Sequence, residues 1–232
     1  MTVIYLFPHG GAGASSYRSY AAAFPREVGR VVPVEIPGRG KRSHEPFAAS
    51  ISGCASLMLQ QIDATGEDFV FHGHCMGALL AFEAIKSIQA GGGELPLYLM
   101  VSGRNAPGHM NEWLSRVPDL DDRALFETLR DIGGVSSGLS FAMAKPFLDV
   151  LRKDQAMSRD YDPGAARIDV PILALAGRDD RMTSASELAD WKSYTSKSVS
   201  VEWLDGQHYF PLDQPSRVAL HVQRFGEFRD QP

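Results

Sequence analysis

Residues 73–77 read Gly-His-Cys-Met-Gly, and this stretch decides the fold of the chain. It follows an apolar run at 69–71 and precedes a run of helical periodicity at 78–88, which together predict a strand, a sharp turn and a helix. The two glycines flank Cys75 where a Cβ in so tight a turn would collide with the neighbouring strand or helix. The cysteine is therefore expected in the open at a helix N-terminus. There the helix dipole and free N–H groups favour an anion and lower the pKa of a thiol.

Short apolar runs alternate with amphipathic runs along most of the chain. We expect strands and helices in alternation, with strands at 3–7, 31–36, 69–72, 97–102, 172–176 and 199–204, and helices at 16–24, 48–62, 76–90 and 215–228. This alternation is typical of an α/β fold with a mostly parallel central sheet and helices on both faces.

The rhythm changes between about residues 107 and 162, where no strand signal occurs. Helix-like runs at 121–132 and 140–161 fill most of this stretch, and glycine- and serine-rich turns interrupt it. The sequence contains no internal repeat and no low-complexity tail. We therefore predict one domain over 1–232, with a helical lid insertion at about 107–162.

Composition narrows the class of protein. The chain has 232 residues, 44% hydrophobic and 22% charged, with a net charge of −5, which is ordinary for a soluble globular domain. Its longest basic cluster, residues 39–42, is short, so nucleic acid is not an expected partner. No apolar stretch approaches the roughly 20 residues of a membrane helix. The N-terminus lacks the basic start of a signal peptide. A soluble, cytoplasmic protein is expected.

The chain has only two cysteines, Cys54 and Cys75. They are too far apart for a Cys-x-x-Cys pattern, so no structural zinc site and no other metal site is expected. Cys54 lies in a helix-like segment, where it is expected to fill space in the core. A free catalytic thiol at Cys75 fits a reducing compartment better than a disulfide scaffold does.

A nucleophile on such a turn needs a general base and a group that orients the base. Of the seven histidines, His208 stands in a loop just after the last expected strand, and it is our candidate base. The loop after the preceding strand carries Asp179 and Asp180 side by side. The spacing from Gly177 favours Asp180 as the acid that orients His208, with Asp179 left as a capping or surface carboxylate.

An oxyanion hole requires two backbone N–H donors. One is expected from Met76, directly after the nucleophile. The other is expected from the glycine-rich loop after the first strand, where we favour Gly11, with an uncertainty of one residue either way. A phosphate-binding loop would require Gly-Lys-Ser/Thr, which is absent here. His9, in the same loop, is as compatible with lining a pocket as with a structural role.

The order of nucleophile, acid and histidine is that of the α/β-hydrolase fold. Beyond the fold, the chain resembles type II thioesterases of nonribosomal peptide and polyketide pathways over nearly its whole length. The resemblance rests on the motifs FPHGGA (7–12), PGR (37–39) with Arg42, GHCMGA (73–78), SGRNAP (102–107) and FLDVLRKD (147–154) followed by Tyr161, and on the acid and histidine loops.

The resemblance implies a substrate and a partner. Such enzymes act on acyl or aminoacyl thioesters of 4′-phosphopantetheine on carrier proteins, which implies carrier-protein partners, a monomer and no bound cofactor. The lid would shape an acyl pocket and a channel for the pantetheine arm. Aromatic and apolar lid residues are as compatible with lining this pocket as with forming lid core: Trp113, Leu114, Phe126, Phe141, Met143 and Phe147. Because carrier proteins are usually acidic, a basic surface around residues 39–42 is expected.

The family pattern has serine where this chain has Cys75, and this departure leaves three interpretations. In the first, Cys75 is the natural nucleophile of an editing thioesterase. In the second, the protein is an acyltransferase, because a thioester acyl-enzyme exchanges readily with another thiol or amine. In the third, the cysteine is an engineered replacement of serine that traps an intermediate. A fourth, non-catalytic alternative is a hydrolase fold that only binds carriers.

Overall fold

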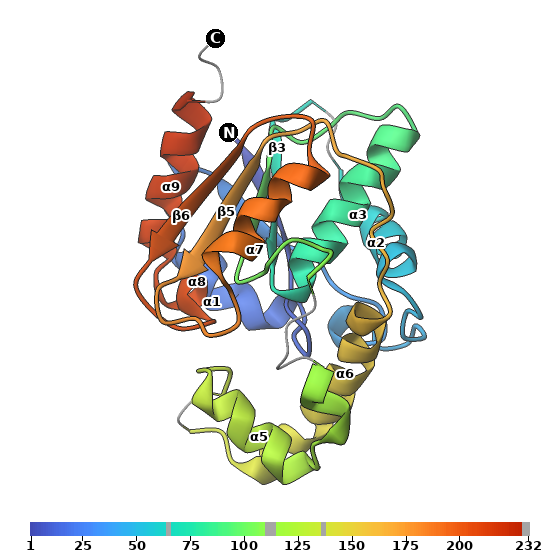
Figure 1. The fold of residues 1–232 in the computed structure, drawn as a ribbon. Helices are drawn as coiled ribbons and strands as arrows, with labels where there is room; N and C mark the ends of the chain where they lie inside the picture. Colours follow the sequence, from blue (N-terminus) through green and yellow to red (C-terminus); the bar gives the residue numbers. More distant parts are fainter. Residues whose placement is uncertain (64–65, 110–114, 136–137, 229–232) are drawn as a thin grey trace.

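The computed structural model describes residues 1–63, 66–109, 115–135 and 138–228. Among these residues a single sheet of parallel strands runs through the molecule in the order β2-β1-β3-β4-β5-β6 (Figure 1). The strands are β1 (Val3–Phe7), β2 (Arg30–Pro33), β3 (Phe69–His74), β4 (Leu99–Ser102), β5 (Ile172–Gly177) and β6 (Val199–Leu204). The predicted parallel α/β architecture is confirmed. Parallel neighbours need crossover connections, and helices provide them here.

Helices cover both faces of this sheet. The helices of the described residues, of which α5 and α6 lie apart from the sheet, are α1 (Arg18–Ala23), α2 (Ile51–Leu59), α3 (Met76–Ala90), α5 (Asp122–Asp131), α6 (Phe141–Arg159), α7 (Ala185–Ala189), α8 (Phe210–Asp213) and α9 (Pro215–Phe228). Short 3₁₀ turns are η1 (Ala14–Tyr17), η2 (Gly40–Arg42), η3 (Val117–Asp119) and η4 (Asp190–Tyr194). No described helix combines the length and the apolar character that crossing a membrane would require.

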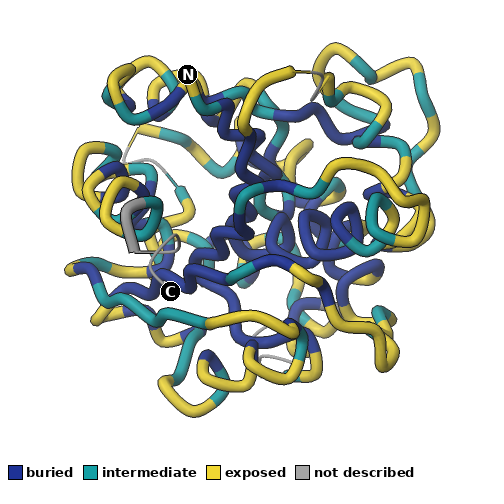
Figure 2. The backbone as a smooth tube through the Cα atoms, turned by 90° about the horizontal axis from the view of Figure 1, so that it is seen from above, coloured by how far each residue is buried: buried dark blue, intermediate teal, exposed yellow. Residues whose placement is uncertain are grey.

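The core follows from the period of two along each strand. In β1, Val3, Tyr5 and Phe7 pack into one apolar cluster with α2 and α3, while Ile4 and Leu6 pack into a second cluster with α1 and α9. Figure 2 shows the buried backbone in the middle of the molecule and exposed turns around it. The interior is therefore rigid on both sides of the strand ends that carry the site.

The segment between β4 and β5 contains η3, α5 and α6, and no strand among its described residues. In Figure 1 α5 and α6 lie below the sheet, outside its two helical layers. They have an apolar cluster of their own, built on Leu125, Phe126, Leu148 and Leu151. We call this segment the insertion. It holds the α5 and α6 helices that the sequence predicted between 107 and 162.

Element ends differ from the expected ones for local reasons. The expected strand at 31–36 ends at Pro33, and after one further bond, from Val34 N–H to the Leu6 carbonyl at 2.8 Å, the chain leaves the sheet. The helix expected from 48 begins at Ile51, because the Ser50 side chain caps it by accepting from Gly53 N–H. The short helices α7 and α8 were not predicted, since four or five residues carry no readable periodicity.

Candidate active site

Cys75 occupies a strained turn between β3 and α3. Its φ is 53° and its ψ −114°, and it is the one non-glycine residue with positive φ among those described. Such a conformation costs about 1–3 kcal/mol and persists only where its surroundings enforce it. The flanking glycines enforce it here: a Cβ on Gly73 would lie 2.3 Å from the Gly77 carbonyl oxygen, and one on Gly77 would lie 1.9 Å from that of Phe7. The steric reason predicted for both glycines is confirmed.

Backbone hydrogen bonds fix the turn further. The Cys75 N–H donates to the Ser102 carbonyl oxygen at 2.9 Å, which ties the end of β3 to the end of β4. The Ala78 N–H donates to the Cys75 carbonyl oxygen at 3.1 Å and begins α3. The Met76 backbone N–H, at the start of α3, contributes to lowering the pKa of the Cys75 thiol. The nucleophile is 6% exposed.

His208 and Asp180 come to Cys75 from the loops after β6 and β5. His208 Nδ1 donates to Asp180 Oδ2 at 3.0 Å, and both side chains are almost fully buried. Asp180 Oδ1 accepts from the Met182 N–H at 2.8 Å, so both carboxylate oxygens are engaged. Asp179 is exposed. The structure thus brings Cys75, His208 and Asp180 together and leaves the neighbouring aspartate in solvent.

The protonation of this group favours an ion pair. Burial opposes ionisation of the Cys75 thiol, but the His208 charge and hydrogen bond, with smaller contributions from Arg104 and the Met76 N–H, bring its pKa below the usual value. Burial also opposes the charged form of His208. The Cys75 thiolate and the hydrogen bond to Asp180 outweigh it and raise the pKa of the imidazole. Each charge therefore favours the other, and the site stabilises the thiolate–imidazolium form of the pair.

Two further histidines flank His208 but stay neutral. The ring of His74 lies 5.1 Å from the His208 ring, and the His9 ring lies 5.7 Å from that of His74. Burial lowers the pKa of His9 to about 3 and brings the pKa of His74 well below its usual range. His9 Nδ1 also lies 2.5 Å from the Tyr17 hydroxyl. Positive charge is thereby concentrated on His208, the one imidazole of the three with an acid partner.

Gly11 has a partner that the sequence did not reveal. Its N–H donates to Asp154 Oδ2 at 2.7 Å, and its φ is +80°. This N–H is therefore engaged and does not fit the expected role of oxyanion donor. The reason is tertiary: α6 carries a carboxylate into the loop after β1 from 143 positions along the chain. Among the described residues, none accepts a hydrogen bond from the neighbouring Gly10 N–H.

Asp154 is held in turn by Arg39. The guanidinium donates to both carboxylate oxygens, at 2.6 and 2.7 Å, and also to the Ala12 carbonyl oxygen at 2.9 Å. The two side chains are 9% and 3% exposed. We call this arrangement of Arg39, Asp154 and Gly11 the clasp. It joins α6 to the loops after β1 and β2.

The basic surface expected at residues 39–42 is wrong. Arg39 is buried in the clasp, and Arg42 is engaged by Glu45 through two contacts of 2.6 Å. Only Lys41 presents an exposed basic side chain in this stretch. Glu45 stands in the same stretch as Arg42, but Asp154 lies 115 positions from Arg39, and the sequence gave no sign of that pairing.

The expected lid residues fall into different environments. Phe126 is buried in the core of the insertion and meets Phe141 at 5.6 Å between ring centroids. Met143 and Phe147 are 61% and 58% exposed, on the surface of α6. Trp113 and Leu114 lie outside the described residues. Cys54 is fully buried in α2, as predicted.

Arg104 and Asp154 are the residues near the site to which sequence reasoning gave no role. Both stand in motifs that carry the family resemblance, and that was their only signal. Arg104 is 7% exposed and follows Gly103, where a Cβ would lie 3.1 Å from His208 Cε1. Within the described residues no cluster of His, Cys, Asp and Glu has the composition to hold a metal ion.

Comparison with known proteins identifies the family. The family model described as "Thioesterase domain" matches residues 2–225. The thioesterase PikA5 of Streptomyces venezuelae is 29% identical over 220 residues, which span 93% of this chain and 77% of PikA5.

Solved structures extend the likeness to three dimensions. RedJ, a thioesterase from the prodiginine pathway of Streptomyces coelicolor, superposes with a TM-score of 0.82 at 31% identity, covering 97% of this chain and 85% of RedJ. YbtT, a type II thioesterase from the yersiniabactin NRPS/PKS pathway, gives a TM-score of 0.82 at 26% identity, covering 97% and 93%. The α/β-hydrolase fold expected from the order of the motifs is confirmed by these matches.

Proposed function

The chain belongs to the thioesterase domain family of thioester hydrolases, and from this premise we propose that it is a type II, editing thioesterase. Its substrates are acyl or aminoacyl groups bound as thioesters to phosphopantetheinyl carrier proteins of a nonribosomal peptide or polyketide pathway. The pathway class is supported by relatives such as YbtT, a type II thioesterase from the yersiniabactin NRPS/PKS pathway. The observation that carries the proposal is the buried chain of contacts from Cys75 through His208 to Asp180.

The first half-reaction forms the acyl-enzyme. The Cys75 thiolate attacks the carbonyl carbon of the carrier-bound thioester and gives a tetrahedral oxyanion. When the carbon–sulfur bond to pantetheine breaks, the His208 imidazolium gives its proton to the departing thiolate. Asp180 keeps the imidazole in the orientation and tautomer that this transfer needs.

The second half-reaction releases the acid. Neutral His208 now takes a proton from water, and the resulting hydroxide attacks the acyl carbon. The bond to the Cys75 sulfur breaks and the ion pair returns. These steps use only the side chains named above and water. The pantetheine arm is part of the substrate and is not a cofactor of this protein.

The oxyanion needs two N–H donors in both halves. We assign one to Met76, since it directly follows the nucleophile at the start of α3. Gly11 cannot supply the second while it donates to Asp154. We assign the second donor to Gly10, which lies within the one-residue uncertainty of the sequence prediction. The insertion acts as the lid over this site, and the protein is a cytoplasmic monomer; these points remain predictions.

The sulfur nucleophile supports a second candidate, acyl transfer. A thioester acyl-enzyme lies close in free energy to the thioester that formed it, so another thiol or an amine can take the group in place of water. A discriminating experiment supplies an acyl-loaded carrier together with a second, unloaded carrier and follows all species by intact mass. Free acid without label on the second carrier supports hydrolysis, and rapid label there with little acid supports transfer.

The matched controls are cysteine variants. Cys75→Ala should abolish both the release of free acid and the transfer to the second carrier. Cys54→Ala, which removes a buried thiol from α2, should retain whichever activity the parent protein has. Carrier binding without turnover and without a Cys75 adduct in the parent protein would contradict an enzymatic role. Cys75→Ser tests the interpretation as an engineered cysteine, which predicts much faster hydrolysis by the serine form.

A further inference from the structure

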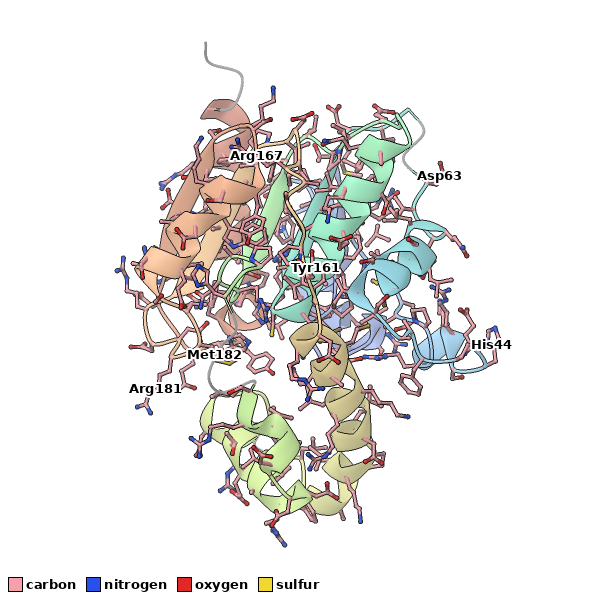
Figure 3. The ribbon with its side chains drawn as sticks, turned by 45° about the vertical axis from the view of Figure 1, so that its right-hand side comes forward. His44, Asp63, Tyr161, Arg167, Arg181 and Met182 are labelled. Carbon is pink, nitrogen blue, oxygen red and sulfur yellow. The ribbon has the colours of Figure 1, made fainter. Side chains whose placement is uncertain are left out.

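A cavity of about 220 Å³ has Arg104 in its wall, two residues after Ser102, whose carbonyl accepts from the Cys75 N–H. Its walls come from the segment after β4, from the last turns of α6 and from the chain after α6, and they include Arg104, Gln155, Ser158 and Tyr161. In Figure 3 Tyr161 stands where the chain leaves α6 and passes α3. The volume equals several water molecules at about 30 Å³ each, which is enough for a small acyl group.

Arg104 is placed next to the reacting atoms by the backbone. It follows Ser102 and Gly103; the Ser102 carbonyl accepts from the Cys75 N–H at 2.9 Å, and Gly103 lies against the His208 ring. The Trp191 side chain fixes the Arg104 carbonyl with a hydrogen bond of 3.1 Å. The guanidinium and the nucleophile also sense each other's charge, which lowers the pKa of the thiol. A group bound at Arg104 would therefore lie close to an acyl carbon on Cys75.

The guanidinium of Arg104 has no partner among the described residues. Its residue is 7% exposed, Nε is sealed from solvent without an acceptor, and no described carboxylate pairs with it. The comparison with Arg39 is instructive, because that buried arginine has Asp154 at 2.6 Å. The Cys75 thiolate compensates the Arg104 charge in part, but this negative charge is lost when the acyl-enzyme forms, and a carboxylate that arrives with the acyl group can then replace it.

The other charged groups of the cavity are already engaged. Arg159 pairs with Asp160 at 2.9 Å, and His109 pairs with Asp190 at 2.6 Å. Asp162, at the exposed rim, accepts from the Gly164 N–H. Gln155 Oε1 is the second sealed polar atom without a partner, and its amide can rotate to present N–H donors. The interior of the cavity therefore offers one cation and one amide to a ligand.

The chemistry of this pair fits a carboxylate. A guanidinium presents a planar fork of N–H groups that matches the two oxygens of a carboxylate. The phosphate of a pantetheine arm is a poor alternative, since the whole arm separates it from the thioester carbon. An anion beside Cys75 must be carried by the acyl group itself.

We propose that this cavity is an acyl subsite for carboxyl-bearing acyl thioesters, the half-thioesters of dicarboxylic acids such as malonyl and succinyl groups, with Arg104 as the ion-pair partner of the free carboxylate. The proposal rests on the thioester hydrolysis proposed above. It makes Arg104 a residue that determines specificity, while the chemistry stays with Cys75 and His208.

The test compares substrates of equal shape and different charge. N-acetylcysteamine thioesters of malonate and succinate are matched with those of isovalerate and 4-methylpentanoate, in which methyl groups replace the carboxylate oxygens. We expect kcat/KM to favour the carboxyl substrate of at least one pair by about 10-fold or more. Arg104→Met should reduce this preference by about 10- to 100-fold, the effect of a charge-assisted hydrogen bond. Arg159→Met, at the same cavity but exposed, should leave the preference unchanged.

A binding measurement separates the two proposals. Amide analogues, in which nitrogen replaces the thioester sulfur, are titrated by calorimetry into the parent protein and Arg104→Met. Tighter binding of the carboxyl analogues, lost in the variant, supports the subsite even if no thioester is hydrolysed, and only the proposed function would then fail. Hydrolysis of all four thioesters without a carboxyl preference, and with the same ratios in Arg104→Met, would overturn the subsite and leave the proposed function standing.

Discussion

Asp180 and Asp154 are both buried carboxylates that accept from a basic side chain, yet they control different parts of the site. Asp180 holds His208 and thereby decides where a proton rests. Asp154 holds Arg39 and the Gly11 N–H and thereby decides where a backbone loop lies. The difference shows that the contact between Asp180 and His208 sets the charge on the base, while the clasp sets the position of the main chain beside the site. Each region can be broken separately.

The largest effect is expected at the nucleophile. Cys75→Ala should lower kcat for an acyl-carrier substrate by about 10⁴-fold or more, because the remaining groups cannot form the acyl-enzyme. Cys54→Ala is the matched control and should keep kcat within a few-fold. The measurement is release of free acid, with folding of both variants checked by circular dichroism. Residual activity near the parent level in Cys75→Ala would remove Cys75 from the mechanism.

Asp180→Asn should have the next largest effect. The amide keeps the volume but not the charge, and it presents a donor as readily as an acceptor to His208, so kcat should fall by about 10³- to 10⁴-fold. Asp179→Asn changes the neighbouring, exposed carboxylate and should leave kcat unchanged. Equal losses in the two variants would show that the effect comes from the charge of the loop and not from the contact with His208.

The clasp is expected to affect the stability of the fold more than it affects proton transfer at His208. Asp154→Asn leaves the buried Arg39 charge without a carboxylate, which should lower the free energy of unfolding by about 3–5 kcal/mol. The control is Asp122→Asn, which breaks the ion pair of 3.1 Å with the half-buried Arg152 and should cost less than about 1 kcal/mol. Urea denaturation measures both. An Asp154→Asn variant as stable as its control would mean that the clasp does not hold α6 to the sheet.

The sequence predicted the group of Cys75, His208 and Asp180 but not the clasp. Cys75, Asp180 and His208 each follow a strand of the sheet, and the ends of parallel strands meet at one edge, so their proximity follows from chain order and the predicted strands. Asp154 lies within a long amphipathic helix, where a carboxylate is most often a solvated residue. Nothing local indicates that this one faces Arg39.

The prediction for Gly11 failed because the sequence did not reveal the position of Asp154. The glycine-rich loop was placed correctly after β1, but the N–H that looked free is taken by a residue 143 positions away. The cation cluster at 39–42 was misjudged only in part for the same reason: the carboxylate that pairs with Arg39 comes from α6, whereas Arg42 pairs with Glu45, three residues further along the chain. The sequence predicted the groups that stand at strand ends and missed those that depend on the docking of α6.

The smallest expected effect is a shift in the pH dependence of Cys75, and it separates the two carboxylates most sharply. Because the pKa of Cys75 is lowered, its thiolate should persist below the range of a free thiol, near pH 8.5. The rate of alkylation by iodoacetamide should therefore hold as pH falls through that range and decline only below the pKa of Cys75 itself. Mass spectrometry of the Cys75 peptide measures the rate at each pH.

Asp180→Asn should move the midpoint of this alkylation profile upward by about one pH unit. A shift of that size corresponds to a loss of about 1.36 kcal/mol in the stabilisation of the Cys75 thiolate. The direction follows because an imidazolium without its carboxylate is less stable and supports the thiolate less. Asp154→Asn, measured where the variant is folded, should leave the midpoint in place, because the clasp acts on the loop and not on the ion pair. Equal shifts in both variants would mean that the two carboxylates act as one electrostatic field. An unshifted Asp180→Asn would mean that the helix N-terminus, and not the imidazolium, stabilises the thiolate.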